Sequence, residues 1–139
     1  MAGLSIPEDF PLHELLGQEL SNLSIGRQYL MLSFTQLKTV VAGIPKYEAG
    51  ARVEIESGFE YNVGLAQCIK ADNSDLATPA ADLIPLLGQS ITIVERLPNN
   101  ELRLEFGGLG SLKLTVDAEG YESYHLHVAG QSVDVTKEW

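Results

Sequence analysis

Apolar and polar residues alternate along several stretches of the chain, with the period of two that is typical of a β-strand with one buried face. In the clearest stretch, 101–106, Leu102, Leu104 and Phe106 share one face and charged residues share the other. Similar alternation predicts further strands at 19–25, 29–36, 52–56, 59–63, 90–97, 112–116, 124–128 and 133–135. Glycine and proline between 43 and 50 predict a loop there.

The string L-L-G-Q occurs twice, at 15–18 and at 86–89, and each copy ends a short helix-like run. The first run, from 10 to 16, begins after Asp9, the expected N-cap, and the second begins at Thr78. In both copies glycine ends the helix because it accepts a left-handed backbone without strain. An L-x-L-x-F pattern follows each copy after a turn, at 30–34 and at 102–106. The order helix, strand, turn, strand therefore occurs twice, which predicts an internal duplication.

These patterns predict an α+β fold: a mostly antiparallel, curved sheet of about seven to eight strands, covered by two short helices. The length of 139 residues suits a single domain, 1–139. A polar segment of small residues at 72–81 divides the chain into two repeat-like halves, 10–70 and 78–139.

The formal net charge is -10, and the excess of acids is larger in the second part of the chain. Residues 1–70 contain eight acidic and five basic residues, and residues 71–139 contain eleven acidic and four basic residues. Such a field repels phosphate backbones and attracts a basic partner, so we expect no direct nucleic-acid binding. The start of the sequence carries no secretory signal and no stretch is apolar enough to cross a membrane, so we expect a cytoplasmic protein without a membrane partner.

Several carboxylates fall on strand faces or in turns that the alternation leaves exposed to solvent. Exposed acids of this kind solvate a sheet and discourage pairing between sheet edges. The more specific interpretation is a charged surface that recognises a partner. The candidate partner-binding residues are Glu54, Glu56, Glu101, Glu105, Asp117, Glu119 and Glu122.

No residue pattern in the sequence predicts catalysis, and we expect neither a catalytic site nor a cofactor. His125 and His127 share one face of a predicted strand and could reach one metal ion, but no third ligand is evident nearby, so we interpret them as surface residues. His13 is expected at the surface and Cys68 as a buried structural thiol. The glycine-rich stretch 107–110 lies between two strands, which predicts a hairpin turn and not a phosphate loop.

The second half resembles a family of small uncharacterised bacterial proteins that are associated with toxin–immunity loci, of the contact-dependent-inhibition and polymorphic-toxin types. The resemblance covers 86–139: L-L-G-Q, L-R-L-E-F, the glycine hairpin, Y-E-S-Y at 121–124 and the closing Trp139. Gly107 replaces the family's usual aspartate, and Tyr124 replaces its tryptophan. The resemblance implies an immunity protein, and its motifs are structural, so no catalytic residue is carried over.

The leading hypothesis is therefore an acidic immunity protein that binds and occludes a cognate toxin, which we expect to be basic and of the nuclease type. A second hypothesis is a structural module that oligomerises through its sheet. A third is a metal-dependent hydrolase that uses His125 and His127.

Overall fold

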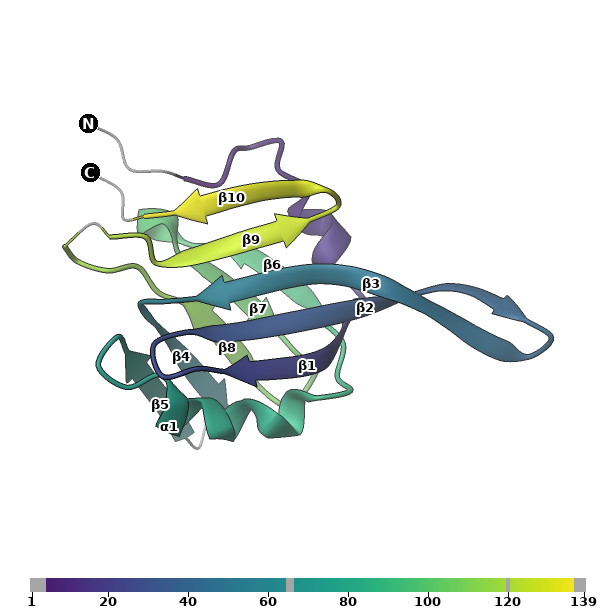
Figure 1. Ribbon diagram of the computed structural model, residues 1–139, viewed down its shortest axis with the longest axis horizontal. Helices are drawn as coiled ribbons and strands as arrows, with labels where there is room; N and C mark the ends of the chain where they lie inside the picture. The colour runs from purple at the N-terminus through teal and green to yellow at the C-terminus, as the bar shows by residue number, and fades with distance from the viewer. Residues whose placement is uncertain (1–4, 65–66, 120, 137–139) are drawn as a thin grey trace.

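The computed structural model describes residues 5–64, 67–119 and 121–136, which fold into two packed antiparallel sheets (Figure 1). In the described residues each sheet has five strands. The order in the first sheet is β1 (Glu19–Ile25), β2 (Leu30–Val41), β3 (Ile44–Ile55), β9 (Tyr124–Val128) and β10 (Gln131–Val135). The order in the second sheet is β5 (Gln67–Asp72), β4 (Gly58–Val63), β8 (Ser111–Leu114), β7 (Leu102–Glu105) and β6 (Ile93–Arg96).

The antiparallel pairing and the short helices were predicted, but the single curved sheet of seven to eight strands was wrong. The chain crosses from one sheet to the other between β3 and β4, and again between β8 and β9. Alternation predicts which side chains face a core, and it carries no information on which strands are neighbours. The core that results lies between the two sheets, and both contribute fully buried leucines to it, among them Leu32 and Leu104.

The helices are shorter and tighter than the sequence predicts. The first is a single 3₁₀ turn, η1 (Leu12–Leu15). The second region begins as one α-helical turn, α1 (Ala77–Ala80), and continues as the 3₁₀ segment η2 (Ala81–Leu86), which contains Pro85. A further 3₁₀ turn, η3 (Pro98–Asn100), precedes β7. No helix in the described part of the chain is long and apolar enough to cross a membrane.

The two parts of the chain contribute strands to the sheets in a reciprocal way. The first three strands, β1 to β3, lie in the first sheet and the next two lie in the second; β6 to β8 lie in the second sheet and the last two lie in the first. The register repeats as well, because Leu32 pairs with Leu23 and Leu104 pairs with Val94. Both leucines are fully buried, so equivalent positions occupy equivalent environments.

Each L-L-G-Q string hydrogen-bonds to the residues that follow the other string, at the join between the halves. The amide of Gly17 donates to the carbonyl of Ile91 at 2.8 Å, and the amide of Gly88 donates to the carbonyl of Leu20 at 2.8 Å. Glu19 forms an isolated antiparallel bridge with Ser90, its counterpart 71 residues later. The repeated string is therefore a structural joint at which each half hydrogen-bonds to the other.

We expect alanine substitutions at the two glycines of this joint to lower the stability of the fold by similar amounts. Gly17 and Gly88 have φ angles of +82° and +86°, and a Cβ at either position meets no atom within 4 Å. Alanine at each position should therefore lower the free energy of unfolding by about 1–2 kcal/mol through backbone strain alone. Urea unfolding measures this loss. Gly108→Ala, with equal space and no positive φ, is the control, and losses no larger than the control would contradict the account.

Gln18 in the first string is buried, and its side chain hydrogen-bonds to the backbone of the first sheet. Its Oε1 accepts a hydrogen bond from the Ala51 amide at 2.8 Å, and its Nε2 donates to the Glu14 carbonyl at 2.7 Å. The corresponding Gln89 is exposed. The side chain of Gln18 thus satisfies a buried amide of β3 that would otherwise have no partner.

Replacing Gln18 with alanine should lower the free energy of unfolding by about 1–3 kcal/mol, because the Ala51 amide would then be buried without a hydrogen bond. Gln89→Ala removes the same group from an exposed position and should change stability by less than about 0.5 kcal/mol. Parallel urea unfolding of both variants measures the difference. Equal losses in the two variants would show that the Gln18 hydrogen bonds do not stabilise the fold.

The loop predicted between 43 and 50 is instead part of a long hairpin, in which β2 and β3 continue beyond the rest of the sheet (Figure 1). Only Ala42 and Gly43 form its turn, both with positive φ. Pro45 is tolerated because the outer side of this two-stranded extension has no further strand to receive an amide. We call residues 36–48 the arm. Its exposed large apolar side chains are Leu37, Val40, Val41, Ile44 and Tyr47.

Candidate functional site

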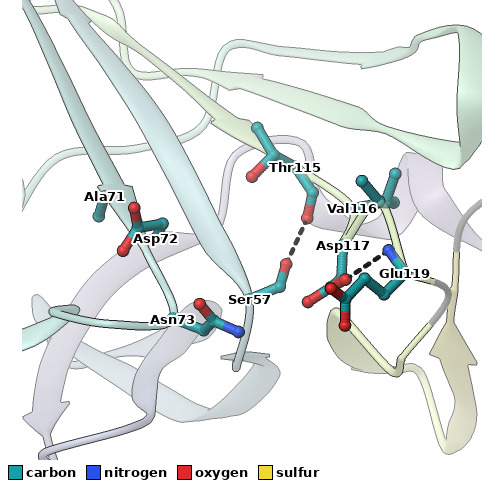
Figure 2. A pocket seen from close by; sticks show the side chains of 9 residues that line it. Ser57, Ala71, Asp72, Asn73, Thr115, Val116, Asp117 and Glu119 are labelled. Atoms are coloured by element: carbon teal, nitrogen blue, oxygen red, sulfur yellow. Dashed lines mark hydrogen bonds between the residues drawn. The ribbon is translucent and has the colours of Figure 1, made fainter.

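An acidic hollow lies at the end of the sandwich opposite the arm, where the chain changes sheets (Figures 1 and 2). It is an open depression of about 350 Å³. It is lined by Ser57, Ala71, Asp72, Asn73, Thr115, Val116, Asp117, Ala118 and Glu119. These lining residues include three carboxylates and no lysine, arginine, histidine or cysteine. The hollow can therefore attract a cationic group.

Short hydrogen bonds fix the segments that carry these carboxylates. Ser57 Oγ donates to the Thr115 carbonyl at 2.9 Å and so ties the β3–β4 crossing to the end of β8 (Figure 2). The amide of Glu119 donates to Asp117 Oδ1 at 2.7 Å, and the amide of Asp117 donates to Ser123 Oγ at 2.7 Å. The turn after β8 is thus held in one shape, with the Asp117 and Glu119 side chains beside each other.

Asp72 lines the hollow from the end of β5, on the other side from these two residues (Figure 2). Hydrogen bonds from the Ser74 hydroxyl and the Ser74 amide hold the pKa of the Asp72 carboxyl below its ordinary value. Asp72 therefore stays ionised at neutral pH. A neighbouring depression, lined by Gln28, Tyr29, Glu56 and Asn73, shares Asn73 with the first one, so the acidic surface continues toward Glu56.

Glu56 also belongs to a second cluster of side chains, which is centred on His125 of β9. The imidazole Nδ1 lies 2.6 Å from Asp134 Oδ1, and Nε2 lies 3.1 Å from Glu56 Oε2 and 3.9 Å from Glu122 Oε2. Burial lowers the pKa of His125, but the hydrogen bonds and charges of Asp134 and Glu56 outweigh it and leave the pKa above its ordinary value. Three carboxylates thus surround one largely buried ring.

The two histidines of the H-x-H pair have separate partners. His127 Nδ1 lies 2.7 Å from Ser132 Oγ, and its Nε2 lies 3.9 Å from Glu54 Oε1. The prediction that both are surface residues was wrong for His125, because its strand lies between β3 and β10 and its ring is enclosed by Glu56, Glu122 and Asp134. His13 is exposed, as predicted.

The structure brings together only part of the predicted partner-binding set. Asp117 and Glu119 line the hollow, and Glu56 and Glu122 lie beside His125 at the same end. Glu101 borders the hollow, because its Oε2 accepts a hydrogen bond at 3.2 Å from the amide of Val116, a lining residue, whereas Glu54 and Glu105 are not among the lining residues. All three face cationic or titratable neighbours. These neighbours are His127 beside Glu54, Lys113 beside Glu101 and Arg103 beside Glu105.

Two acids of this end were missed by the sequence analysis. Asp72 lies in the polar segment interpreted as a seam, and that segment's run of small polar residues was a usable signal for a loop at a site. Asp134 alternates with Val133 and Val135 in β10 and looks like any outward strand residue. Only the register of β10 on β9, which pairs Asp134 with His125, reveals its role.

Two further predictions can be compared with the structure. Cys68 is exposed on β5, and the prediction of a buried thiol was wrong because β5 is an edge strand with most of its side chains in solvent. The glycine-rich stretch connects β7 and β8 as a hairpin, which confirms that prediction. Trp139, which the family resemblance uses, lies outside the described residues.

This end of the molecule combines several carboxylates with one enclosed imidazole. Clustered carboxylates are suited to binding cations, whether metal ions or the basic side chains of another protein. Comparison with known proteins found no matching family model, no matching curated protein and no matching solved structure.

Proposed function

We propose that this protein binds and neutralises one basic protein partner, in the manner of an immunity protein that occludes a bacterial toxin. The observation that carries the proposal is the acidic hollow, which Asp72 at the end of β5 and Asp117 and Glu119 in the turn after β8 line without a cationic side chain among the lining residues. A basic loop or helix end of a partner supplies the missing positive charge.

The overall charge supports the same proposal. A net charge of -10 produces a negative field around the molecule, and an open acidic depression focuses that field at one end. Such a field steers a basic partner and raises the association rate, while contacts made after docking set the lifetime of the complex. Occlusion of the partner's active surface needs shape and charge complementarity, and it requires no catalytic group in this chain.

A second candidate function, an assembly module, is favoured by the arm. Its five large apolar side chains are each more than half exposed, between 54% and 58%, although exposed apolar patches on single-chain proteins are usually small. The arm projects from the body and presents an unpaired strand edge on each side. Self-association through the arm would appear as a defined oligomer in light scattering.

The experiment that tests the leading proposal is co-expression with the product of the adjacent gene. We expect the partner alone to inhibit growth, this chain to restore growth, and the two to purify as one complex that dissociates as salt is raised. Growth inhibition that this chain does not relieve, together with no complex at low salt, would overturn the proposal. A defined oligomer that binds no partner would favour the assembly function instead.

A further inference from the structure

The His125 cluster has the composition and spacing of a metal site, and it is separate from the acidic hollow. His125 Nε2 and one carboxylate oxygen each from Glu56 and Glu122 lie within 4.8 Å of one another. In a tetrahedral zinc site with bonds of about 2.0–2.2 Å, neighbouring ligand atoms are about 3.4 Å apart. The two distances from Nε2, 3.1 Å and 3.9 Å, lie on either side of that value.

We propose that Glu56, Glu122 and His125 bind one divalent transition-metal ion of the zinc class, through one imidazole nitrogen and two carboxylate oxygens. The set combines a borderline nitrogen donor with hard oxygen donors, which suits Zn²⁺ better than Mg²⁺ or Ca²⁺ because those ions prefer oxygen ligands alone. The proposal is independent of the partner-binding function.

Asp134 gives the imidazole the orientation that a metal ligand needs. Its carboxylate lies 2.6 Å from Nδ1 and can accept the Nδ1–H hydrogen bond, which leaves Nε2 facing Glu56 and Glu122. A metal ion that binds Nε2 would displace the proton that Nε2 shares with Glu56. A carboxylate that orients a ligating histidine through its other nitrogen is the usual outer partner in zinc sites. The largely buried ring, with 10% of its side chain exposed, cannot turn away freely.

The charge of the cluster also favours a dication over a proton. Three carboxylates around one ring leave a net negative charge even when the imidazole is protonated, because a single proton on the ring compensates only one of them. A divalent ion bound by Nε2 and two of the carboxylates compensates two of the three negative charges. Glu56 and Glu122 have about half of their side-chain surface exposed, so a fourth position on the ion is open to water.

Metal binding would connect segments that are far apart in the sequence. Glu56 lies at the β3–β4 crossing, Glu122 lies in the β8–β9 connection, and Asp134 links the ring to β10. Both crossings between the sheets are thereby joined at one point. We therefore expect the ion to raise the midpoint of thermal unfolding, since it binds the folded arrangement only.

Isothermal titration of the chelator-treated full chain with ZnCl₂ tests the site without any partner. We expect one ion per chain with a dissociation constant in the micromolar range or below. Glu122→Gln should weaken binding at least tenfold, and Asp134→Asn should weaken it about 10- to 100-fold while leaving the three ligands in place. Co²⁺ bound at the same site should show the visible absorption of a tetrahedral ion, which disappears in His125→Gln.

The matched control is His127→Gln, which removes the neighbouring imidazole on the same strand face and should leave both the affinity and the Co²⁺ spectrum unchanged. Glu122 is half exposed, so its variant keeps the fold even where His125→Gln does not; circular dichroism checks both. The absence of saturable binding, or several weak sites that Glu122→Gln does not affect, would overturn the proposal. Loss of binding in His127→Gln would place the ion elsewhere and would overturn it as well.

Discussion

Replacing Phe106 with alanine is expected to lower the free energy of unfolding by about 3–5 kcal/mol, the largest loss of stability that we predict for a single substitution. The ring follows β7 in the second sheet and stacks on Phe34 of the first, with centroids 6.4 Å apart and planes 15° apart. Both side chains are buried, at 1% and 2% exposure. Alanine would remove a stacking contact between the two sheets and leave a cavity in the densely packed core.

Phe34→Ala is the matched variant, because Phe34 occupies the equivalent position in the other half. We expect a similar loss, and a double-mutant cycle should give a coupling of about 0.5–1.5 kcal/mol for the stacked pair. Urea unfolding monitored by circular dichroism measures all three variants. A loss below about 1 kcal/mol for either single variant, or strictly additive losses, would show that the two sheets are not joined through these rings.

The second large effect concerns association with a basic partner. Neutralising the hollow with Asp72→Asn, Asp117→Asn and Glu119→Gln together should lower the association rate by about 10- to 100-fold at low salt, because the focused field that steers the partner is lost. The amide side chains keep the size and the acceptor oxygens of the originals, so the local hydrogen bonds can persist. Stopped-flow or surface-plasmon measurements over a salt series give the rates.

The control variant removes the same number of charges from Glu8, Glu14 and Glu95, none of which lines the hollow. It reduces the negative net charge by the same amount as the hollow variant does. We expect it to change the association rate less than about threefold. At high salt, where the Debye length is about 3 Å, the two variants and the original chain should converge. Equal effects of the two triple variants would mean that net charge, and not the hollow, governs association.

Local patterns in the sequence predicted local structure well. Leu102, Leu104 and Phe106 were predicted to point inward from one strand, and all three are buried, because a side-chain period of two determines the face of a strand. The glycines of the repeated L-L-G-Q string were predicted to end short helices, and Gly17 and Gly88 do so with positive φ. Each of these features depends on interactions within a few residues.

Features that depend on distant pairing were not predictable. The sequence indicated a break between the strands at 52–56 and 59–63, but not a change of sheet, because that change depends on β9 and β8 as neighbours. Strand β5 was missed because an edge strand buries few side chains and its alternation is weak. The arm was missed because Gly43 and Pro45, which interrupt most strands, are tolerated in a two-stranded extension.

The candidate site was likewise predictable where it depends on local sequence and not where it depends on distant pairing. Asp117 and Glu119 were selected from a turn pattern, and the hollow contains both. Their meeting with Asp72, and the meeting of His125 with Asp134 and Glu56, arises from strand register and sheet crossing. Residue types thus indicated an acidic surface, while the fold decided which acids share it.

Amide hydrogen exchange on the complex with the product of the adjacent gene tests the central claim most directly, since it locates the contact surface on this chain. The account predicts that binding protects the amides of 56–57, 72–75 and 115–119 at the acidic end, and leaves those of the arm, 36–48, unchanged. Protection confined to the arm, with the acidic end exchanging as in the free protein, would contradict the claim that this protein recognises its partner through the acidic hollow.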